Sequence, residues 1–524
     1  MSIGRSTYWN GAVVLVAVVF AWLCTIPSAV ALIDWDSAAY IAEIASGRYG
    51  WSHTPWSTHL GIGQEYLLGV WLAQAFGGTV IDGFRIVNAL AFAAACWLIF
   101  DTAWRCSGGR ALAVALAALW ATTWVNLHYH LILEDNFLFL APCAALLRIC
   151  VLRADCWRPR DSLLCGMFGL LAVLGSYQAM PYIFAAGYAA LLSPGRSLRK
   201  RMRDALFVAL GFAGSLVVWV TFTLATSRLT WRALSVQLLM GPAPNYMPRS
   251  ASAFFSYLFD GHSFFEMLGN GVLWNLSFNA YRLPWTSPIS RLTLGLVAAL
   301  LLLLMFAAAT WWSWKHRRFA PHIVAATLLV VTFLTSIHKD ETPYVGLKRY
   351  DFLALLTVFL VASLLGRWHR LARRRWLATS SLLLVFLVAC TQLVVGLRWS
   401  VREQARYVTT SSWNEFPHPD QMRYGREGKS WFRYFRDLER EHRNACALVL
   451  SYGEIADSTW NFDITGSLYS EVHEHLAIVD DAMIAQFLPD QRRVVPRLMH
   501  AKRAKIPACA WVSDAAREVL AGAR

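Results

Sequence analysis

The chain has 524 residues, of which 57% are hydrophobic and 15% are charged. A soluble domain carries about 25% charged residues, so this composition excludes an ordinary water-soluble protein and indicates an integral membrane protein. The formal net charge of +15 does not point to nucleic acid, because the basic residues gather in short loops between apolar runs instead of forming one patch or stripe.

Apolar runs near the length needed to cross a bilayer, about 20 residues, recur along the chain as far as residue 397. They predict an α-helical polytopic protein with about eleven transmembrane helices. The short pair between 162 and 192 is either two short helices or one bent hairpin. The predicted spans are 12–33, 84–103, 111–127, 136–152, 162–175, 179–192, 205–226, 291–314, 321–337, 350–366 and 376–397.

The distribution of Lys and Arg predicts the topology. Five short loops hold 18 Lys and Arg in 42 residues, whereas the alternate segments hold 8 in 140 residues. By the positive-inside rule, the basic loops and the N-terminus face the cytoplasm. We therefore expect a multi-pass protein of the cell inner membrane, in contact with membrane lipids, with its C-terminal segment in the periplasm. The basic loops are 104–110, 153–161, 194–204, 315–320 and 367–375.

Two units are predicted along the chain. We expect residues 1–397 to form a transmembrane unit with long external loops at 34–83 and 227–290, and residues 398–524 to form a soluble extracytoplasmic α/β domain. In that domain, short apolar segments alternate with polar, helix-forming ones. Its two cysteines, Cys446 and Cys509, either form a disulfide or stay unpaired. The predicted strands lie in 445–454, 475–483 and 508–514, and the predicted helices in 431–443 and 514–524.

Ionisable residues gather at three places on the predicted external face. Asp34 and Asp36 follow the first apolar run, with His53 later in the same loop, and Glu134 and Asp135 precede the fourth run. Carboxylates can deprotonate a hydroxyl or hold a divalent cation. Arg and Lys can hold a phosphate. The third group, at the tenth run, consists of His338, Lys339, Lys348, Arg349 and Tyr350.

Three segments carry a resemblance to a known superfamily. DWDSAAYIAEIASG (34–47), followed by His53-Thr54-Pro55, resembles the first external loop of bacterial GT-C glycosyltransferases. LEDNFLFLAPCAALL (133–147) is similar to the acidic start of their fourth helix, and LKRYDFLALL (347–356) to a late helix near the donor phosphate. The similar branches are the protein O-mannosyltransferases and the aminoarabinose transferases. The resemblance covers roughly residues 10–400.

The resemblance implies transfer of a sugar from a polyprenyl-phosphate donor to an acceptor hydroxyl on a protein, lipopolysaccharide or glycan of the cell envelope. It implies that Asp36, at the head of the motif, is the general base and Asp34 a helper, or the reverse. Either aspartate is alternatively a helix N-cap. The resemblance also implies a set of residues at the donor phosphate, all basic except the tyrosine. They are Arg349, Lys348 and Tyr350, and in second place Lys339 and His338. Snorkelling of the cationic side chains to the interface is the alternative.

Glu134, Asp135 and His53 are expected to orient the acceptor or to bind a divalent metal, Mg²⁺ or Mn²⁺. Capping of the fourth helix by the two acids is the alternative, and no cofactor is required. Two other functions stay open from the sequence. One is a transporter or flippase of lipid-linked sugars, although the ionisable residues lie at one face instead of the mid-membrane position typical of transporters. The other is a scaffold that binds a partner through the tail.

Overall fold

The computed structural model describes two parts of the chain, a set of long helices and a small sheet. The helical part comprises 80–107, 109–123, 126, 136–175, 179–226, 288–336, 346–371 and 383–394 without 393, with the isolated positions 13, 17, 68, 69, 71, 72, 75 and 231. The sheet part comprises 438, 440–451, 476–479, 498–499 and 505–522. The backbone alone is described at 80–85, 136–138, 226, 288–295, 298, 333–336, 346–351, 365–371, 476–479 and 498–499.

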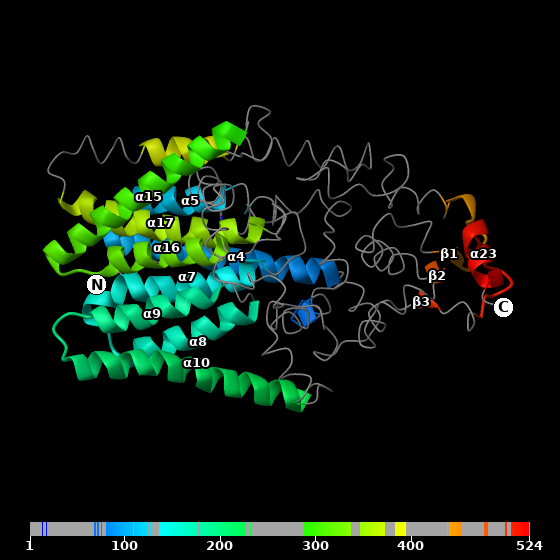
Figure 1. The fold of residues 1–524 in the computed structure, drawn as a ribbon, viewed down its shortest axis with the longest axis horizontal. Coiled ribbons are helices and arrows are strands. Elements are labelled where there is room, and N and C mark those ends of the chain that lie inside the picture. The colour runs from blue at the N-terminus through cyan, green and yellow to red at the C-terminus, as the bar shows by residue number, and fades with distance from the viewer. Residues whose placement is uncertain are drawn as a thin grey trace, which may run out of the picture.

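The helices lie side by side in a bundle (Figure 1). Their side chains are mostly apolar around the whole circumference, which is the pattern of helices surrounded by other helices or by lipid. α4, α7, α9, α16 and α17 share one core of buried apolar residues. The helices are α4 (Val80–Ser107), α5 (Arg110–Ala121), α7 (Asn136–Arg153), α8 (Pro159–Gly175), α9 (Met180–Leu192), α10 (Leu198–Thr226), α15 (Pro288–His316), α16 (Ala320–Ser336) and α17 (Gly346–Leu371).

These helices fall within or around the predicted spans, with differences at their ends. α10 begins at Leu198 instead of 205, because Arg and Lys are good helix formers and its first turns contain the basic run. α5 ends at Ala121 instead of 127, since Thr122 leaves the helical conformation. α8 and α9 are two separate short helices that pack together. Residues 383–392 are helical within the last predicted span.

Two of the described helical segments, Ile86–Ser107 and Leu198–Ala225, have the length and apolar composition of a membrane span. The first is 67% buried in the bundle and the second 11% buried. α10 therefore lies at the periphery, with an apolar surface suited to lipid. Shorter apolar helices make up most of the rest, among the residues described. The count of eleven spans stays a prediction.

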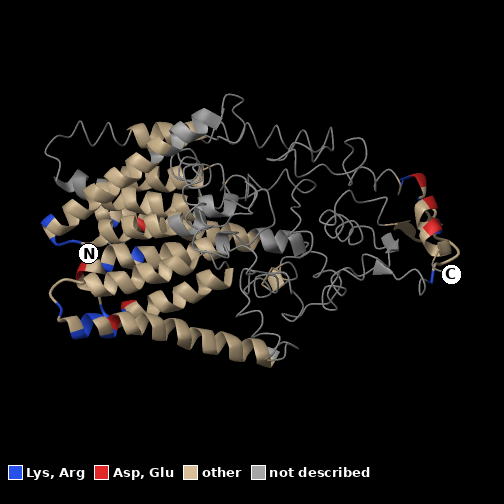
Figure 2. Cartoon of the chain, in the orientation of Figure 1, with Lys and Arg blue, Asp and Glu red and all other residues tan. Residues whose placement is uncertain are grey.

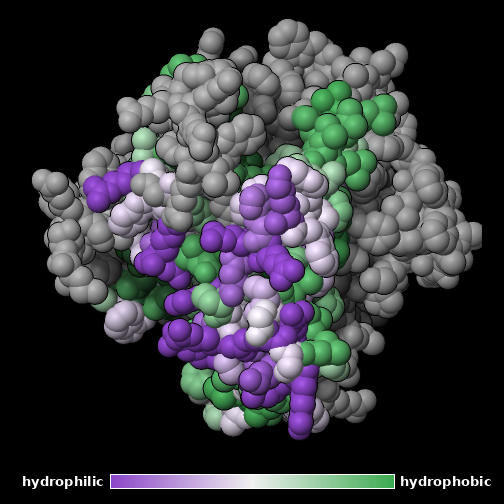
Figure 3. Space-filling model, turned by 90° about the vertical axis from the view of Figure 1, so that its left-hand side faces the viewer, coloured by the Kyte–Doolittle hydropathy of each residue, from purple (hydrophilic) through white to green (hydrophobic). Residues whose placement is uncertain are grey.

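The bundle has one strongly basic end. The loops that join α4 to α5, α7 to α8, α9 to α10 and α15 to α16 lie there, and Lys and Arg gather at this end (Figure 2). Seen along the bundle from this end, hydrophilic residues gather on the face toward the viewer (Figure 3). Four of the five predicted basic loops thus share one end. We call it the basic end, and the other the far end, where α7, α9 and α17 begin.

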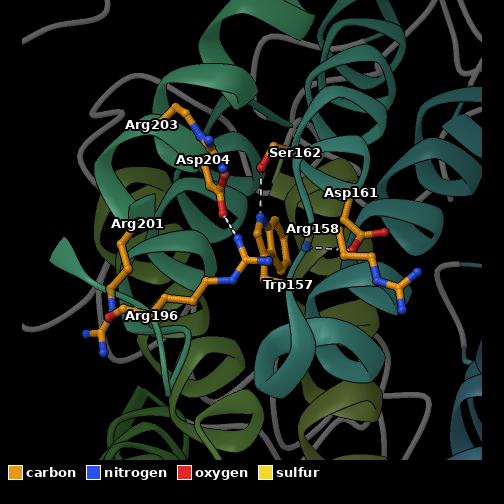
Figure 4. A network of polar contacts seen from close by, with 8 residues as sticks. All are labelled: Trp157, Arg158, Asp161, Ser162, Arg196, Arg201, Arg203 and Asp204. Carbon is orange, nitrogen blue, oxygen red and sulfur yellow. Dashed lines mark hydrogen bonds and ion pairs between the residues drawn. The ribbon is translucent and has the colours of Figure 1, made fainter. Parts of the chain in front are cut away.

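Hydrogen bonds fix the α9–α10 loop at the basic end. Arg196 forms an ion pair with the fully buried Asp204, and an Arg203 nitrogen lies 3.3 Å from the other oxygen of that carboxylate (Figure 4). Arg201 Nε donates to the carbonyl oxygen of Arg196 over 3.0 Å. Several basic side chains of this loop therefore stabilise its conformation through specific contacts, in addition to their role as topology signals.

The α7–α8 loop is fixed next to it. The indole nitrogen of Trp157, a fully buried residue, donates to Ser162 Oγ over 2.7 Å (Figure 4). Asp161 Oδ2 accepts the backbone N–H of Arg158 over 2.9 Å. Both contacts close the short turn that leads into α8.

The C-terminal part contains a four-stranded parallel sheet in the order β3-β2-β1-β4. α23 (Asp514–Gly522) packs on β1 and β2. The disulfide between Cys446 and Cys509, with Cα atoms 5.5 Å apart, joins the segments that lead into β1 and β4. Three strands lie inside the predicted segments, and β3 was not predicted because two residues show no periodicity. The strands are β1 (Leu448–Ser451), β2 (Leu476–Val479), β3 (Leu498–Met499) and β4 (Trp511–Val512).

Candidate functional site

Most of the residues predicted for the site lie outside the described part of the chain. These are Asp34, Asp36, His53, Glu134, Asp135, His338 and Lys339. The structure gives the backbone of Lys348, Arg349 and Tyr350, which lie in the first turns of α17, without their side chains. Their assigned roles therefore stay predictions. The helices that lead to them are described in detail.

An aromatic contact joins the starts of three helices at the far end. The ring of Phe139, near the start of α7, stacks on that of Phe352 in α17, with centroids 4.9 Å apart and planes at 13°. Tyr182, near the start of α9, donates its hydroxyl to the Phe352 carbonyl oxygen over 2.9 Å. Gly175, the last residue of α8, lies so close to Phe139 that an added Cβ would stand 2.6 Å from that side chain's Cβ. We call these four residues the far-end junction.

The junction sets the positions of two predicted groups relative to one another. Arg349 precedes Phe352 by three residues, and Asn136, where α7 begins, precedes Phe139 by three. Three helical residues rise about 4.5 Å. Asn136 and Arg349 therefore lie at about the same height above the junction, at the far end. Glu134 and Asp135 immediately precede Asn136 in the sequence, so the second and third predicted groups belong to neighbouring helix starts.

The helix N-termini at the far end carry partial positive charges that favour an anion. α7, α9 and α17 all begin there, and each helix N-terminus carries a partial positive charge of about half an elementary charge. None of the three has an acidic residue in its first turn. α9 has Pro181 in that turn and no side-chain cap. Unpaired backbone N–H groups at such ends are suited to phosphate oxygens.

A buried polar group at the far end was not singled out by the sequence. Past the end of α5 lie Thr122, Thr123 and Asn126, with Trp120 in its last turn. The Thr122 hydroxyl lies 3.0 Å from Oε1 of Gln392, in the helical segment 383–392. We call these five residues the outer polar cluster. The sequence signal that could have indicated this cluster is the amide of Gln392 within the predicted apolar span 376–397. A polar residue inside a membrane span is by default a candidate for a functional site.

Two atoms of the outer polar cluster are buried without a hydrogen bond. The indole Nε1 of Trp120 and Oδ1 of Asn126 have no partner in the described part of the chain, and both residues are 0% exposed. An unsatisfied buried polar atom costs about 1–3 kcal/mol. The cluster therefore holds one donor and one acceptor that water or a ligand would stabilise.

No set of three or more His, Cys, Asp or Glu side chains suited to a metal occurs among the described residues. The predicted metal ligands lie outside them. Within the described part of the bundle, the acidic and basic pairs, such as Asp101 with Arg148, belong to the basic half. The chemistry of the far end therefore rests on helix starts, aromatic rings and neutral polar groups within the part described.

Comparisons with solved structures identify the fold. The structure resembles that of ArnT from Cupriavidus metallidurans bound to undecaprenyl phosphate, with a TM-score of 0.56 and 12% identity, over 99% of this chain and 95% of that chain. The archaeal oligosaccharyltransferase AglB from Archaeoglobus fulgidus, in complex with an inhibitory peptide and a dolichol-phosphate, gives a TM-score of 0.43 and 11% identity, over 90% and 64% of the two chains.

No protein-family profile matches the sequence, and no curated protein matches it significantly. The likeness to ArnT extends over nearly the full length of both chains. It shows a GT-C-like fold and agrees with the resemblance carried by the three sequence segments.

Proposed function

We propose that this chain, which has a GT-C-like fold, is a membrane glycosyltransferase. It transfers a sugar from a polyprenyl-phosphate donor to an acceptor hydroxyl on the extracytoplasmic face of the inner membrane. The observation that carries the proposal is the convergence of α7, α9 and α17 at the far end, opposite the basic loops, in a fold that matches ArnT over 99% of this chain. ArnT was solved bound to undecaprenyl phosphate.

In the proposed mechanism the acceptor oxygen attacks the anomeric carbon of the donor sugar. The bond from that carbon to the phosphate oxygen breaks, and Asp36 accepts the proton of the acceptor hydroxyl. Asp34 orients Asp36, or the two exchange roles. The transition state resembles an oxocarbenium ion, so a positioned base and a stabilised leaving group are what the site must supply.

The leaving polyprenyl phosphate needs compensation of its negative charge. Arg349 and Lys348 lie in the first turns of α17, where the positive end of the helix dipole adds to their own charge. Tyr350 can donate a hydrogen bond, and Lys339 with His338 would complete the set. Three helix starts joined at the far-end junction supply further N–H donors in the same region.

The proposed acceptor side lies at the start of α7. Glu134, Asp135 and His53 would bind the acceptor or hold a divalent cation such as Mg²⁺ or Mn²⁺, which carboxylate and imidazole ligands can bind. A cation there would help to neutralise the phosphate. The acceptor is a hydroxyl of a protein, lipopolysaccharide or another glycan of the cell envelope.

The orientation in the membrane is part of the proposal. The basic loops gather at one end (Figure 2), which favours a cytoplasmic position for that end. The disulfide between Cys446 and Cys509 is typical of an oxidising compartment. Both observations favour an extracytoplasmic far end and C-terminal domain.

Binding of undecaprenyl phosphate tests the proposed phosphate site. For Arg349→Ala in purified protein, we expect the Kd to rise roughly 10- to 100-fold, since a charge-assisted hydrogen bond contributes about 1.5–3 kcal/mol. Arg199→Ala, which removes an exposed cation at the basic end, should leave the Kd unchanged.

An unchanged Kd in Arg349→Ala would remove Arg349 from the phosphate site. Equal weakening in both variants would indicate a diffuse charge effect. Tight binding without any sugar transfer would favour a flippase of lipid-linked sugars.

A further inference from the structure

We propose that the outer polar cluster is the subsite that binds the hydroxyl groups of the donor's sugar. This inference rests on the proposed function, because it names where the sugar of a polyprenyl-phosphate donor is held. The cluster consists of Trp120, Thr122, Thr123, Asn126 and Gln392.

The cluster lies at the end of the bundle where the chemistry is proposed. α5 begins at the basic end and the cluster follows its other end, and Gln392 lies near the end of a helical segment that also leads away from a basic loop. α5 packs against α17, the helix that carries Arg349. The sugar subsite and the proposed phosphate site are therefore on helices in direct contact.

The backbone and side chains of the cluster are held in place by hydrogen bonds. Thr123 Oγ1 donates to the Trp120 carbonyl oxygen over 3.0 Å. Asn126 Nδ2 donates to the same carbonyl, which fixes the orientation of its amide. The ring of Trp120 stacks on Phe92 of α4, with centroids 5.2 Å apart and planes at 23°. Because these groups are already ordered, little conformational freedom is lost when a ligand binds.

This fixed arrangement leaves Trp120 Nε1 and Asn126 Oδ1 without a partner in the described residues. Other buried side chains, such as Ser193, Thr223 and Ser313, also have an unsatisfied hydroxyl there. A hydroxyl can turn toward any neighbour, whereas an indole N–H and a fixed amide oxygen each point in one direction. The two atoms of the cluster are thus defined donor and acceptor positions.

The chemistry of the cluster selects the class of ligand. It offers one donor and one acceptor, which together match hydroxyl groups, since a hydroxyl both donates and accepts. None of its five members is charged, so the cluster is suited to a neutral group and not to a phosphate. The sugar of the donor is the neutral, hydroxyl-bearing part. The basic residues at the start of α17 are the counterpart for the phosphate.

A conservative substitution separates this role from a structural one. Trp120→Phe removes the unsatisfied N–H and keeps an aromatic ring against Phe92. The matched control is Trp157→Phe, because Trp157 is also fully buried but donates its N–H to Ser162 at the basic end. The ligands are undecaprenyl phosphate alone and undecaprenyl phosphate carrying mannose, glucose or arabinose.

We expect wild type to bind at least one sugar-bearing lipid more tightly than undecaprenyl phosphate alone. Trp120→Phe should weaken that binding about tenfold, as the loss of one hydrogen bond in a buried site would, and leave binding of the sugar-free lipid unchanged. Trp157→Phe should change neither. Asn126→Ala, which removes the amide oxygen that acts as the acceptor, should reproduce the selective loss.

Equal affinity of Trp120→Phe and wild type for the sugar-bearing lipid would overturn the inference and assign the two atoms to buried water. Equal weakening for both lipids would overturn it in favour of a structural role. In either case, retained binding of undecaprenyl phosphate by wild type would leave the proposed function standing. If wild type bound no polyprenyl phosphate at all, the proposed function and this inference would both fail.

Discussion

Asp101 shows how a single residue carries charge inside the apolar bundle. Its carboxylate, 1% exposed, lies 2.6 Å from a guanidinium nitrogen of Arg148 and 2.9 Å from Nε of Arg105. The pair with Arg148 joins α4 to α7, and the pair with Arg105 lies one turn along α4. Because both arginines reach solvent, the charges are compensated without full desolvation of all three groups.

Removing this carboxylate should destabilise the fold. In Asp101→Ala, Arg148 and Arg105 lose the carboxylate that pairs with them, and we expect the free energy of unfolding to fall by about 3 kcal/mol, at the lower end of the range for a broken buried pair because both arginines reach solvent. Thermal unfolding of the solubilised protein measures it. Asp514→Ala, where the carboxylate is 96% exposed and pairs with Arg517, is the control and should have no effect beyond about 0.5 kcal/mol. Equal midpoints for the two variants would contradict a structural role for Asp101.

At the scale of elements, glycine lets α8 and α10 approach closely. An added Cβ on Gly211 of α10 would stand 2.5 Å from the carbonyl oxygen of Leu163, and one on Gly166 of α8 would collide with the Val208 carbonyl. Small residues at such crossings are how helices associate where lipid, and not water, surrounds them. α10 is held to the bundle mainly through this contact with α8 and through α9.

Adding a methyl group at the crossing should therefore separate the two helices. We expect Gly211→Ala to cost about 1–3 kcal/mol by overpacking, seen as a lower unfolding temperature. Gly214→Ala, on the same helix with open space around it, should be neutral or slightly stabilising because Ala has the better helix propensity. A loss of stability in Gly214→Ala as large as in Gly211→Ala would refute the close-approach argument.

The elements also show what the sequence can and cannot predict. Apolar runs locate the helices well, because length and hydropathy are properties of one segment. The far-end junction could not be predicted, since Phe139, Tyr182 and Phe352 look like ordinary apolar-span residues and are far apart in the sequence. The outer polar cluster was missed for the same reason. The contact of Gln392 with Thr122 joins residues that are far apart in the sequence, and no periodicity of either segment predicts it.

At the scale of the whole molecule, the two ends of the helical bundle have different chemistry. The basic end contains short loops fixed by arginine contacts (Figure 4). The far end contains helix starts with no acidic residue in the first turn of α7, α9 or α17, stacked aromatic rings and neutral polar groups. The sequence predicted this polarity from the positions of Lys and Arg, because topology signals are local. The site itself stays a prediction, since its acidic residues lie outside the described part of the chain.

The most direct test of the account is sugar transfer from radiolabelled undecaprenyl-phosphate sugars to membrane extracts by wild type, Asp36→Asn and Asp34→Asn at matched amounts. Because an asparagine cannot accept the proton of the acceptor hydroxyl, the account predicts transfer by wild type and a loss of at least about 100-fold in one of the variants, with folding unchanged. Full activity in both variants would remove the proposed base. No transfer from any sugar by well-folded wild type would contradict the assignment as a glycosyltransferase.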